Sequence, residues 1–200
     1  MTGVAMPVLP VYVHDGLGFG PFVVGLVAGT QFAATLISRL WAGRYADLHG
    51  SKRAVLAGLS FAGAAGAAYL ASAHFATHPI ASVTILLVGR ALLGVMESFV
   101  ITAALTWGVT LAGPQNTGTV MSWVGTALYT AFAVGAPLGT VLYASYGFAA
   151  IALATMLLPL ATVRVVAPLR PIAPLSHRLR SSRQLTAESQ MRSTPTGVRA

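Results

Sequence analysis

The sequence lacks cysteine and has few charged residues. Its 200 residues include no Cys, which excludes disulfides and thiolate metal sites. Only 8% of the residues are charged, against about 25% in a typical soluble domain. No Gly-x-x-x-x-Gly-Lys phosphate loop occurs, which excludes an ATP-driven pump domain within this chain. These absences argue against an ordinary water-soluble enzyme, and the hydrophobic share of 56% indicates a membrane protein.

The longest uncharged stretch covers residues 98–163, which hold no Asp, Glu, Lys, Arg or His. A membrane-spanning helix needs about 20 apolar residues, so this stretch has room for more than two spans. Glycine, proline and polar turns divide the whole chain into a partial first segment and five spans. The predicted segments are residues 1–13 (partial), 21–41, 54–73, 80–111, 119–144 and 148–163. We expect an all-α membrane protein.

The basic residues gather in two places. Residues 164–200 carry a net charge of +6, and their Pro/Arg/Ser-rich composition predicts a disordered tail. The other group flanks the connection after the second segment: Arg39, Arg44, Lys52 and Arg53. The turns at 14–20, 74–79 and 145–147 hold no Lys or Arg. Because cytoplasmic loops are enriched in these residues, we expect the basic connection and the tail to be cytoplasmic.

The basic connection reads Gly43-x-x-x-Asp47-x-x-Gly50-x-Lys52-Arg53. A glycine permits a positive φ in a tight turn, and a short carboxylate can cap a helix or pair with an arginine. The alternative is a plain stop-transfer loop whose charges only set the topology. The pattern resembles the signature loop between helices 2 and 3 of the major facilitator superfamily of secondary transporters. It departs at Leu48 and Ser51, where family members often carry a basic residue.

The resemblance implies a six-helix half-bundle with its first helix incomplete, in a bacterial inner membrane. It also implies that Gly43, Asp47, Gly50, Lys52 and Arg53 form a cytoplasmic gate. Such transporters bind their solute between two six-helix halves, so the expected partner is a missing C-terminal half or a second copy. The runs LPVYVHD and AGRYADLHG are similar to a YhhS-like branch, often described as arabinose or drug efflux proteins.

Arg90 and Glu97 are charged residues within an apolar segment. Such charges cost about 2.5–3.5 kcal/mol on insertion scales and mark functional sites by default. Leu86-x-x-x-Arg90-x-x-x-Gly94 resembles the fourth-helix motif of the same superfamily, which implies proton transfer or solute binding by Arg90. Glu97 then becomes a candidate proton or solute site, and Gln31 a candidate cavity residue. The alternative is that these side chains only hydrogen-bond neighbouring helices.

Gly135, Pro137 and Gly139, with Gly125 earlier in the segment, resemble the glycine-proline motif of the antiporter branch. Ala136 departs from that motif, because the family pattern has Gly directly followed by Pro. The expected role is helix bending along a face poor in side chains. The alternative is ordinary packing of small residues.

We therefore predict proton-coupled efflux of a small solute, either a sugar or a drug-like molecule, by alternating access. The proton gradient would supply the energy, with no cofactor, no metal and no nucleic acid partner. A membrane enzyme would need paired catalytic groups, and only Glu97 lies deep enough. The abrupt change in composition near Arg164 predicts a truncated form. The rival reading is a non-transporting membrane packing or assembly protein, or an inactive half-transporter.

Overall fold

A computed structural model describes residues 2–168, and these residues fold into helices joined by short turns. No strand occurs among them, so the all-α prediction is confirmed. Within this described part of the chain, five helices, α3 to α7, are long and apolar enough to cross a membrane. The elements are α1 (Thr2–Ala5), α2 (Val8–Val11), the π-helical turn η1 (Tyr12–Gly16), α3 (Pro21–His49), α4 (Ser51–His74), α5 (Pro79–Ala112), the 3-10 turn η2 (Pro114–Asn116), α6 (Thr117–Tyr146) and α7 (Phe148–Val166).

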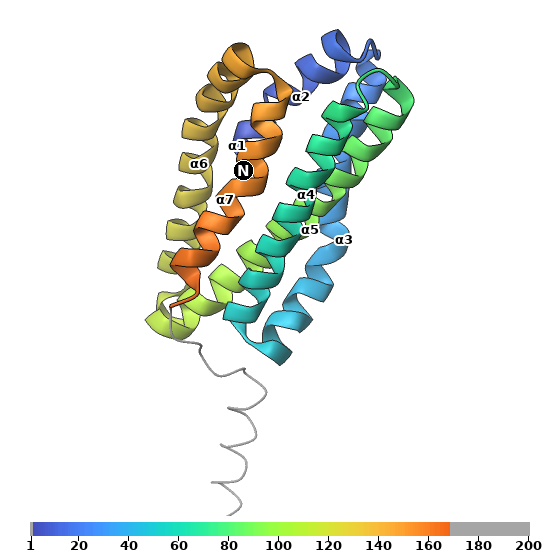
Figure 1. The fold of residues 1–200 in the computed structure, drawn as a ribbon. Coiled ribbons are helices and arrows are strands. Elements are labelled where there is room, and N and C mark those ends of the chain that lie inside the picture. Colours follow the sequence, from blue (N-terminus) through green and yellow to red (C-terminus); the bar gives the residue numbers. More distant parts are fainter. Residues whose placement is uncertain (1, 169–200) are drawn as a thin grey trace, which may run out of the picture.

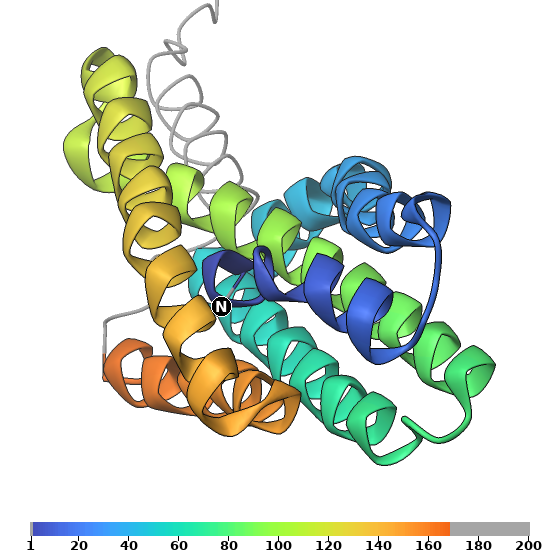
Figure 2. The same ribbon diagram turned by 90° about the horizontal axis from the view of Figure 1, so that it is seen from above.

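The long helices form a bundle organised around α5 (Figure 1). Helix α5 packs against both α3 and α4, and α7 packs against the other side of α4. Helix α6 contacts α1 much more extensively than it contacts α5. Seen from above, the short N-terminal helices lie between the α6–α7 pair and the group formed by α3, α4 and α5 (Figure 2). The N-terminal segment therefore bridges the two parts of the bundle.

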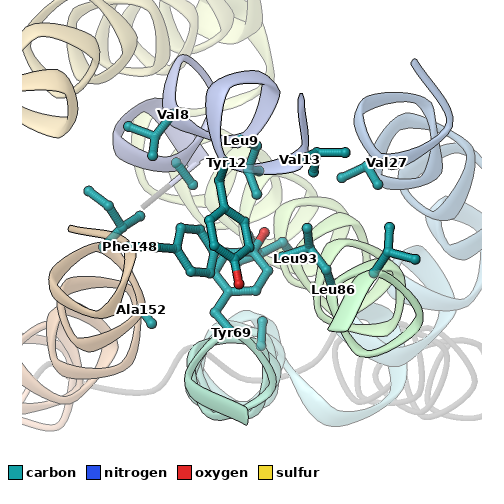
Figure 3. Packing of buried hydrophobic residues seen from close by; sticks show 14 of the residues in the cluster. Val8, Leu9, Tyr12, Val13, Val27, Tyr69, Leu86, Leu93, Phe148 and Ala152 are labelled. Carbon is teal, nitrogen blue, oxygen red and sulfur yellow. The ribbon is translucent and has the colours of Figure 1, made fainter. Parts of the chain in front are cut away.

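Aromatic and hydroxyl groups fix this N-terminal segment in place. The Tyr12 ring stacks on Phe148 of α7, with ring centroids 3.7 Å apart, and Tyr69 of α4 lies against the same Phe148 (Figure 3). The Tyr12 hydroxyl lies 3.3 Å from Ser82 Oγ, and Ser82 Oγ donates to the Ser72 carbonyl oxygen at 2.8 Å. Because these partners belong to α4, α5 and α7, one tyrosine ties the segment to three helices.

The partial first segment, predicted at residues 1–13, is broken rather than continuous. Helix α1 ends at Ala5 and α2 begins at Val8, with Pro7 at the N-cap of α2. Proline has no backbone N–H and is disfavoured inside a helix, which accounts for the break.

The charged connection predicted at 43–53 is helical for most of its length, which corrects the predicted end of the second segment at Trp41. Helix α3 continues to His49, and only Gly50 breaks the helix, with φ of +87°. Helix α4 then begins at Ser51. Burial of Ala42 and Ala46 in a small cluster with Phe99 extends α3 beyond the apolar stretch. The charged residues after Trp41 therefore do not mark the end of helix α3.

The other helices also run a few residues beyond the predicted segments at one or both ends, to the bounds given above. Helix α7 takes in the first residues of the predicted tail, through Val166. Residues 167 and 168 form a turn, and residues 169–200, the rest of that tail, lie outside the described residues, as does the prediction that they are disordered.

The connections alternate between two ends of the bundle (Figure 1). One end holds η1, the α4–α5 turn and Gly147; the other holds Gly50, Gly113 and the end of α7. We call the second the basic end, because it carries five of the six Lys and Arg residues within 2–168: Arg39, Arg44, Lys52, Arg53 and Arg164. Between the ends, large apolar side chains such as Leu36 (72% exposed) and Val141 (64%) point outward, as a lipid-facing surface requires.

Candidate functional site

Three helices bring a carboxylate, an amide and a hydroxyl together inside the bundle. Gln31 of α3 is fully buried, and its Nε2 donates to Glu97 Oε2 of α5 at 2.7 Å. The same nitrogen lies 3.5 Å from the Thr2 hydroxyl of α1. Gln31 and Glu97 therefore hydrogen-bond each other across two helices, and the proton or solute role predicted for them stays a prediction. We call these three residues the polar triad.

Two members of the polar triad, Glu97 and Thr2, border a cavity of about 170 Å³ between α1, α5 and α6, and Gln31 lies behind Glu97. Glu97 is half-buried and reaches this cavity, with Thr2 beside it. The remaining wall is mostly apolar: Gly3, Met96, Val100, Ile101, Leu128, Ala131 and Phe132. Within residues 2–168 no Lys, Arg or His forms a salt bridge with Glu97. The cavity thus presents a single carboxylate to an apolar space.

Close approach of two backbones allows this contact to form. A Cβ added at Gly94 of α5 would collide with the Gln31 carbonyl oxygen and lie 2.9 Å from Ala34 Cβ. The Thr35 hydroxyl donates to the Gly94 carbonyl oxygen at 3.1 Å and closes the same crossing. A glycine at this point lets α3 lie directly against α5, as small residues do at helix interfaces in membranes.

Arg90 occupies a different environment from Glu97, although both belong to α5. Its side chain is 1% exposed, and its Nε donates to the Val27 carbonyl oxygen of α3 at 3.2 Å. Its Nη1 and the Tyr69 hydroxyl are buried without a hydrogen-bond partner among the described residues. The structure therefore separates the two charged residues: Glu97 reaches a cavity, whereas Arg90 is sealed between helices. A role for Arg90 in proton or solute handling stays a prediction.

The residues of the predicted gate lie at the basic end, on α3, α4 and the glycine between them. Asp47 and Arg53 are exposed. Lys52 instead donates from Nζ to the Ala167 carbonyl oxygen at 2.7 Å, at the C-terminal end of α7. Gly43 is part of α3 and has open space where a Cβ would point. The predicted gate residues thus lie together at the basic end. Lys52 already binds a carbonyl oxygen of this bundle, whereas the predicted gate would contact a second half.

The glycines of the predicted bending motif face the N-terminal segment. A Cβ at Gly135 would lie 3.1 Å from the Gly3 carbonyl carbon, and one at Gly139 would collide with the Val4 carbonyl oxygen. Pro137 points outward, and α6 runs through it as one helix from Thr117 to Tyr146. A Cβ added at Gly125 would meet no neighbouring element within 4 Å. Gly135 and Gly139 therefore form a packing surface for α1. A role of the motif in helix bending remains a prediction.

Some of the site was not predicted from the sequence. Thr2, Met96 and Phe132 line the cavity, and Gly3 lies against the Ala131 carbonyl oxygen of α6, with 2.8 Å to an added Cβ. Their residue types are common in any apolar helix. Only the crossing of α1 over α6 distinguishes these residues from other apolar helix residues. Gly3 was the one available signal, since small residues often mark close helix crossings.

Comparison with known proteins agrees with this architecture. The model of the Major Facilitator Superfamily matches residues 1–196. The chain belongs to this superfamily. It is 44% identical over 164 residues to an uncharacterized MFS-type transporter of Salmonella typhimurium, across 82% of this chain and 42% of that protein. It is 43% identical over 166 residues to the uncharacterized MFS-type transporter YhhS of Escherichia coli K12, across 83% and 41%.

An uncharacterized MFS-type transporter of Burkholderia pseudomallei is 47% identical over 137 residues, across 68% of this chain and 34% of its own length. The chain thus spans between about a third and two fifths of the length of these curated relatives. No solved structure matches it significantly. Membership in the superfamily identifies a multi-pass membrane protein of a transporter family and gives no support to an enzymatic role. The resemblance to a YhhS-like branch is confirmed.

Proposed function

We propose that this chain supplies one half of a proton-coupled secondary transporter for a small solute, and that the polar triad is its share of the solute pathway. One observation carries the proposal: among the described residues, a carboxylate whose hydrogen bond comes from a neutral amide borders a cavity with a mostly apolar wall. Ionisable residues inside a membrane are costly and usually line a pathway for ions or solutes. Glu97 is the residue that meets this description.

The chemistry follows from what Glu97 and Gln31 can do. Glu97 can take up a proton and become neutral, or lose it and present a negative charge to the cavity. Gln31 Nε2 orients the carboxylate through its 2.7 Å hydrogen bond. Alternating access would expose this one carboxyl first to one side of the membrane and then to the other. Exchange of a proton for a solute at Glu97 would couple the two movements.

Two further parts belong to the proposal. A second six-helix unit, either a C-terminal half or a second copy, would close the pathway on the far side of the cavity. The exposed Asp47 and Arg53 at the basic end would contact that unit as part of a cytoplasmic gate. The basic end would face the cytoplasm of a bacterial cell, with the protein in the inner membrane. Export is the proposed direction, supported by the resemblance of Gly135, Pro137 and Gly139 to the antiporter motif.

Proton movement in vesicles tests the proposal. The full chain is reconstituted with a pH-sensitive dye inside, and L-arabinose, benzyltrimethylammonium or benzenesulfonate is added outside. We expect at least one of these probes to move protons. Glu97→Gln should abolish that movement, because the amide cannot carry a proton, whereas Trp41→Ala, an exposed residue on α3, should retain it. If none of the three probes moves protons, copies of this chain do not pair into the proposed transporter, and the proposal is wrong for this chain acting without a C-terminal half.

A further inference from the structure

The cavity has properties that select among solutes. We infer that it binds the headgroup of an organic cation, such as an aromatic ammonium, with Glu97 as the counter-charge. This inference rests on the proposed function, because it assigns a solute class to the same site. Charge, hydrogen-bonding capacity and size each support it.

The first argument is charge. A carboxylate in an apolar environment is costly unless a positive charge pairs with it. Within the described residues Glu97 has no such partner: Gln31 is neutral, and Arg90 donates to the Val27 carbonyl oxygen instead. The basic residues Arg39, Arg44 and Arg53 are exposed on the helices that meet at the basic end. A cationic solute would supply the missing charge, and an anionic one would be repelled.

The second argument is hydrogen bonding. A sugar carries several hydroxyl groups, and each one that is buried without a partner costs about 1–3 kcal/mol. The described wall of the cavity offers only the Glu97 carboxylate and the Thr2 hydroxyl as polar side chains. Its other side chains are apolar, with Met96 and Phe132 among them. Methylated ammonium groups and aromatic rings need few hydrogen bonds and pack well on such a wall, and an aromatic face also attracts cations.

The third argument is size. The cavity holds about 170 Å³, which is less than the roughly 300–1,000 Å³ of pockets for drug-sized ligands. This half-bundle therefore holds a compact headgroup rather than an extended molecule. Benzyltrimethylammonium combines a permanent charge, three methyl groups and one aromatic ring, so it matches the three properties of the site in one probe.

Equilibrium binding to the full chain in lipid nanodiscs tests the inference. Binding is measured by calorimetry for benzyltrimethylammonium, benzenesulfonate and L-arabinose. We expect benzyltrimethylammonium to bind at least tenfold more tightly than either of the others. Glu97→Gln, which keeps the shape and removes the charge, should weaken its binding at least tenfold, and Glu97→Asp should weaken it less. Trp41→Ala serves as the control, and far-UV circular dichroism verifies that each variant is folded.

The outcomes separate the solute class from the transporter proposal. Preference for L-arabinose or benzenesulfonate would overturn the organic-cation assignment, and so would the absence of benzyltrimethylammonium binding. Binding that Glu97→Gln leaves unchanged would place the cation elsewhere and also overturn the inference. If one of the other probes drives proton movement that depends on Glu97, the proposed transport stands while the solute class fails. If no probe moves protons, the proposed function itself fails.

Discussion

Arg90 and Glu97 are two charged residues of the same helix, α5, but they differ in burial and in hydrogen-bond partner. Arg90 is 1% exposed and bonded to the backbone of α3, whereas Glu97 is half-buried and borders a cavity. Arg90 lies in the closely packed group formed by α3, α4 and α5. Glu97 lies where α5 meets the N-terminal segment and α6, which pack against it less extensively. Two charged residues of one membrane segment can therefore have very different surroundings, depending on which helices pack against each of them.

A large loss of stability is expected at the crossing of α3 and α5 that lies between these two residues. Gly94→Ala should lower the midpoint of thermal unfolding in detergent by an amount equivalent to about 1–3 kcal/mol, because the new Cβ collides with the Gln31 carbonyl oxygen. Gly29→Ala on α3 is the matched control, since a Cβ there meets nothing within 4 Å. Equal unfolding midpoints for the two variants would show that α3 and α5 are not in close contact.

The second prediction separates the two charged residues by stability. Arg90→Ala should destabilise the bundle by about 2–4 kcal/mol, because it empties space around a large, fully buried side chain. Glu97→Ala should cost less, because removing a half-buried carboxylate from an apolar wall offsets the loss of its hydrogen bond from Gln31. Chemical denaturation in mixed micelles measures both values. The reverse order would contradict the contrast between a sealed and an open site.

The third prediction concerns the amide that orients Glu97. Gln31→Leu keeps most of the side-chain volume but removes the 2.7 Å hydrogen bond to the carboxylate. Hydrogen bonds to charged groups contribute about 1.5–3 kcal/mol, so the affinity for benzyltrimethylammonium should fall about tenfold or more. Thr30→Val is the control on the same helix, because that hydroxyl donates only to the Leu26 carbonyl oxygen of its own helix. Similar affinities for both variants would mean that Gln31 does not orient Glu97.

The smallest expected effect lies at the basic end, far from the cavity. Lys52→Met removes a cation that binds the Ala167 carbonyl oxygen and so stabilises the C-terminal end of α7 by about 0.3–1 kcal/mol. Amide hydrogen exchange should become a few fold faster at residues 163–167. Arg53→Met, the neighbouring exposed residue, should leave exchange there unchanged. An equal effect of both variants would point to the net charge of this end rather than to the Lys52 contact.

The sequence predicted most of the fold because apolar length and turn residues carry that information. The uncharged residues 98–163 resolve into the end of α5 with α6 and α7, as lipid burial requires. The prediction from sequence was wrong between Gly43 and Gly50, where the charged residues suggested a loop. Helix α3 continues there because one of its faces is buried. The membrane boundary and the helix boundary are different physical limits.

The candidate site was only partly predictable. Glu97 and Gln31 stood out because polar side chains are rare in apolar segments, and the structure joins them directly. Arg90 stood out for the same reason, yet it is bonded elsewhere. The apolar wall had no distinguishing mark in the sequence. Phe132 and Met96 line the cavity because α6 packs against both α1 and α5, and packing between distant segments leaves no local pattern.

Carboxyl labelling tests most directly the claim that Glu97 reaches a binding cavity. Dicyclohexylcarbodiimide, an apolar reagent for carboxyl groups, is added to the folded chain in nanodiscs, and the labelled fraction of each acidic residue is followed by mass spectrometry. We predict labelling of Glu97 that benzyltrimethylammonium slows several fold, while labelling of the exposed Asp47 is unchanged by that cation. A Glu97 that stays unlabelled until the protein is unfolded, or that benzyltrimethylammonium does not protect, would contradict the account.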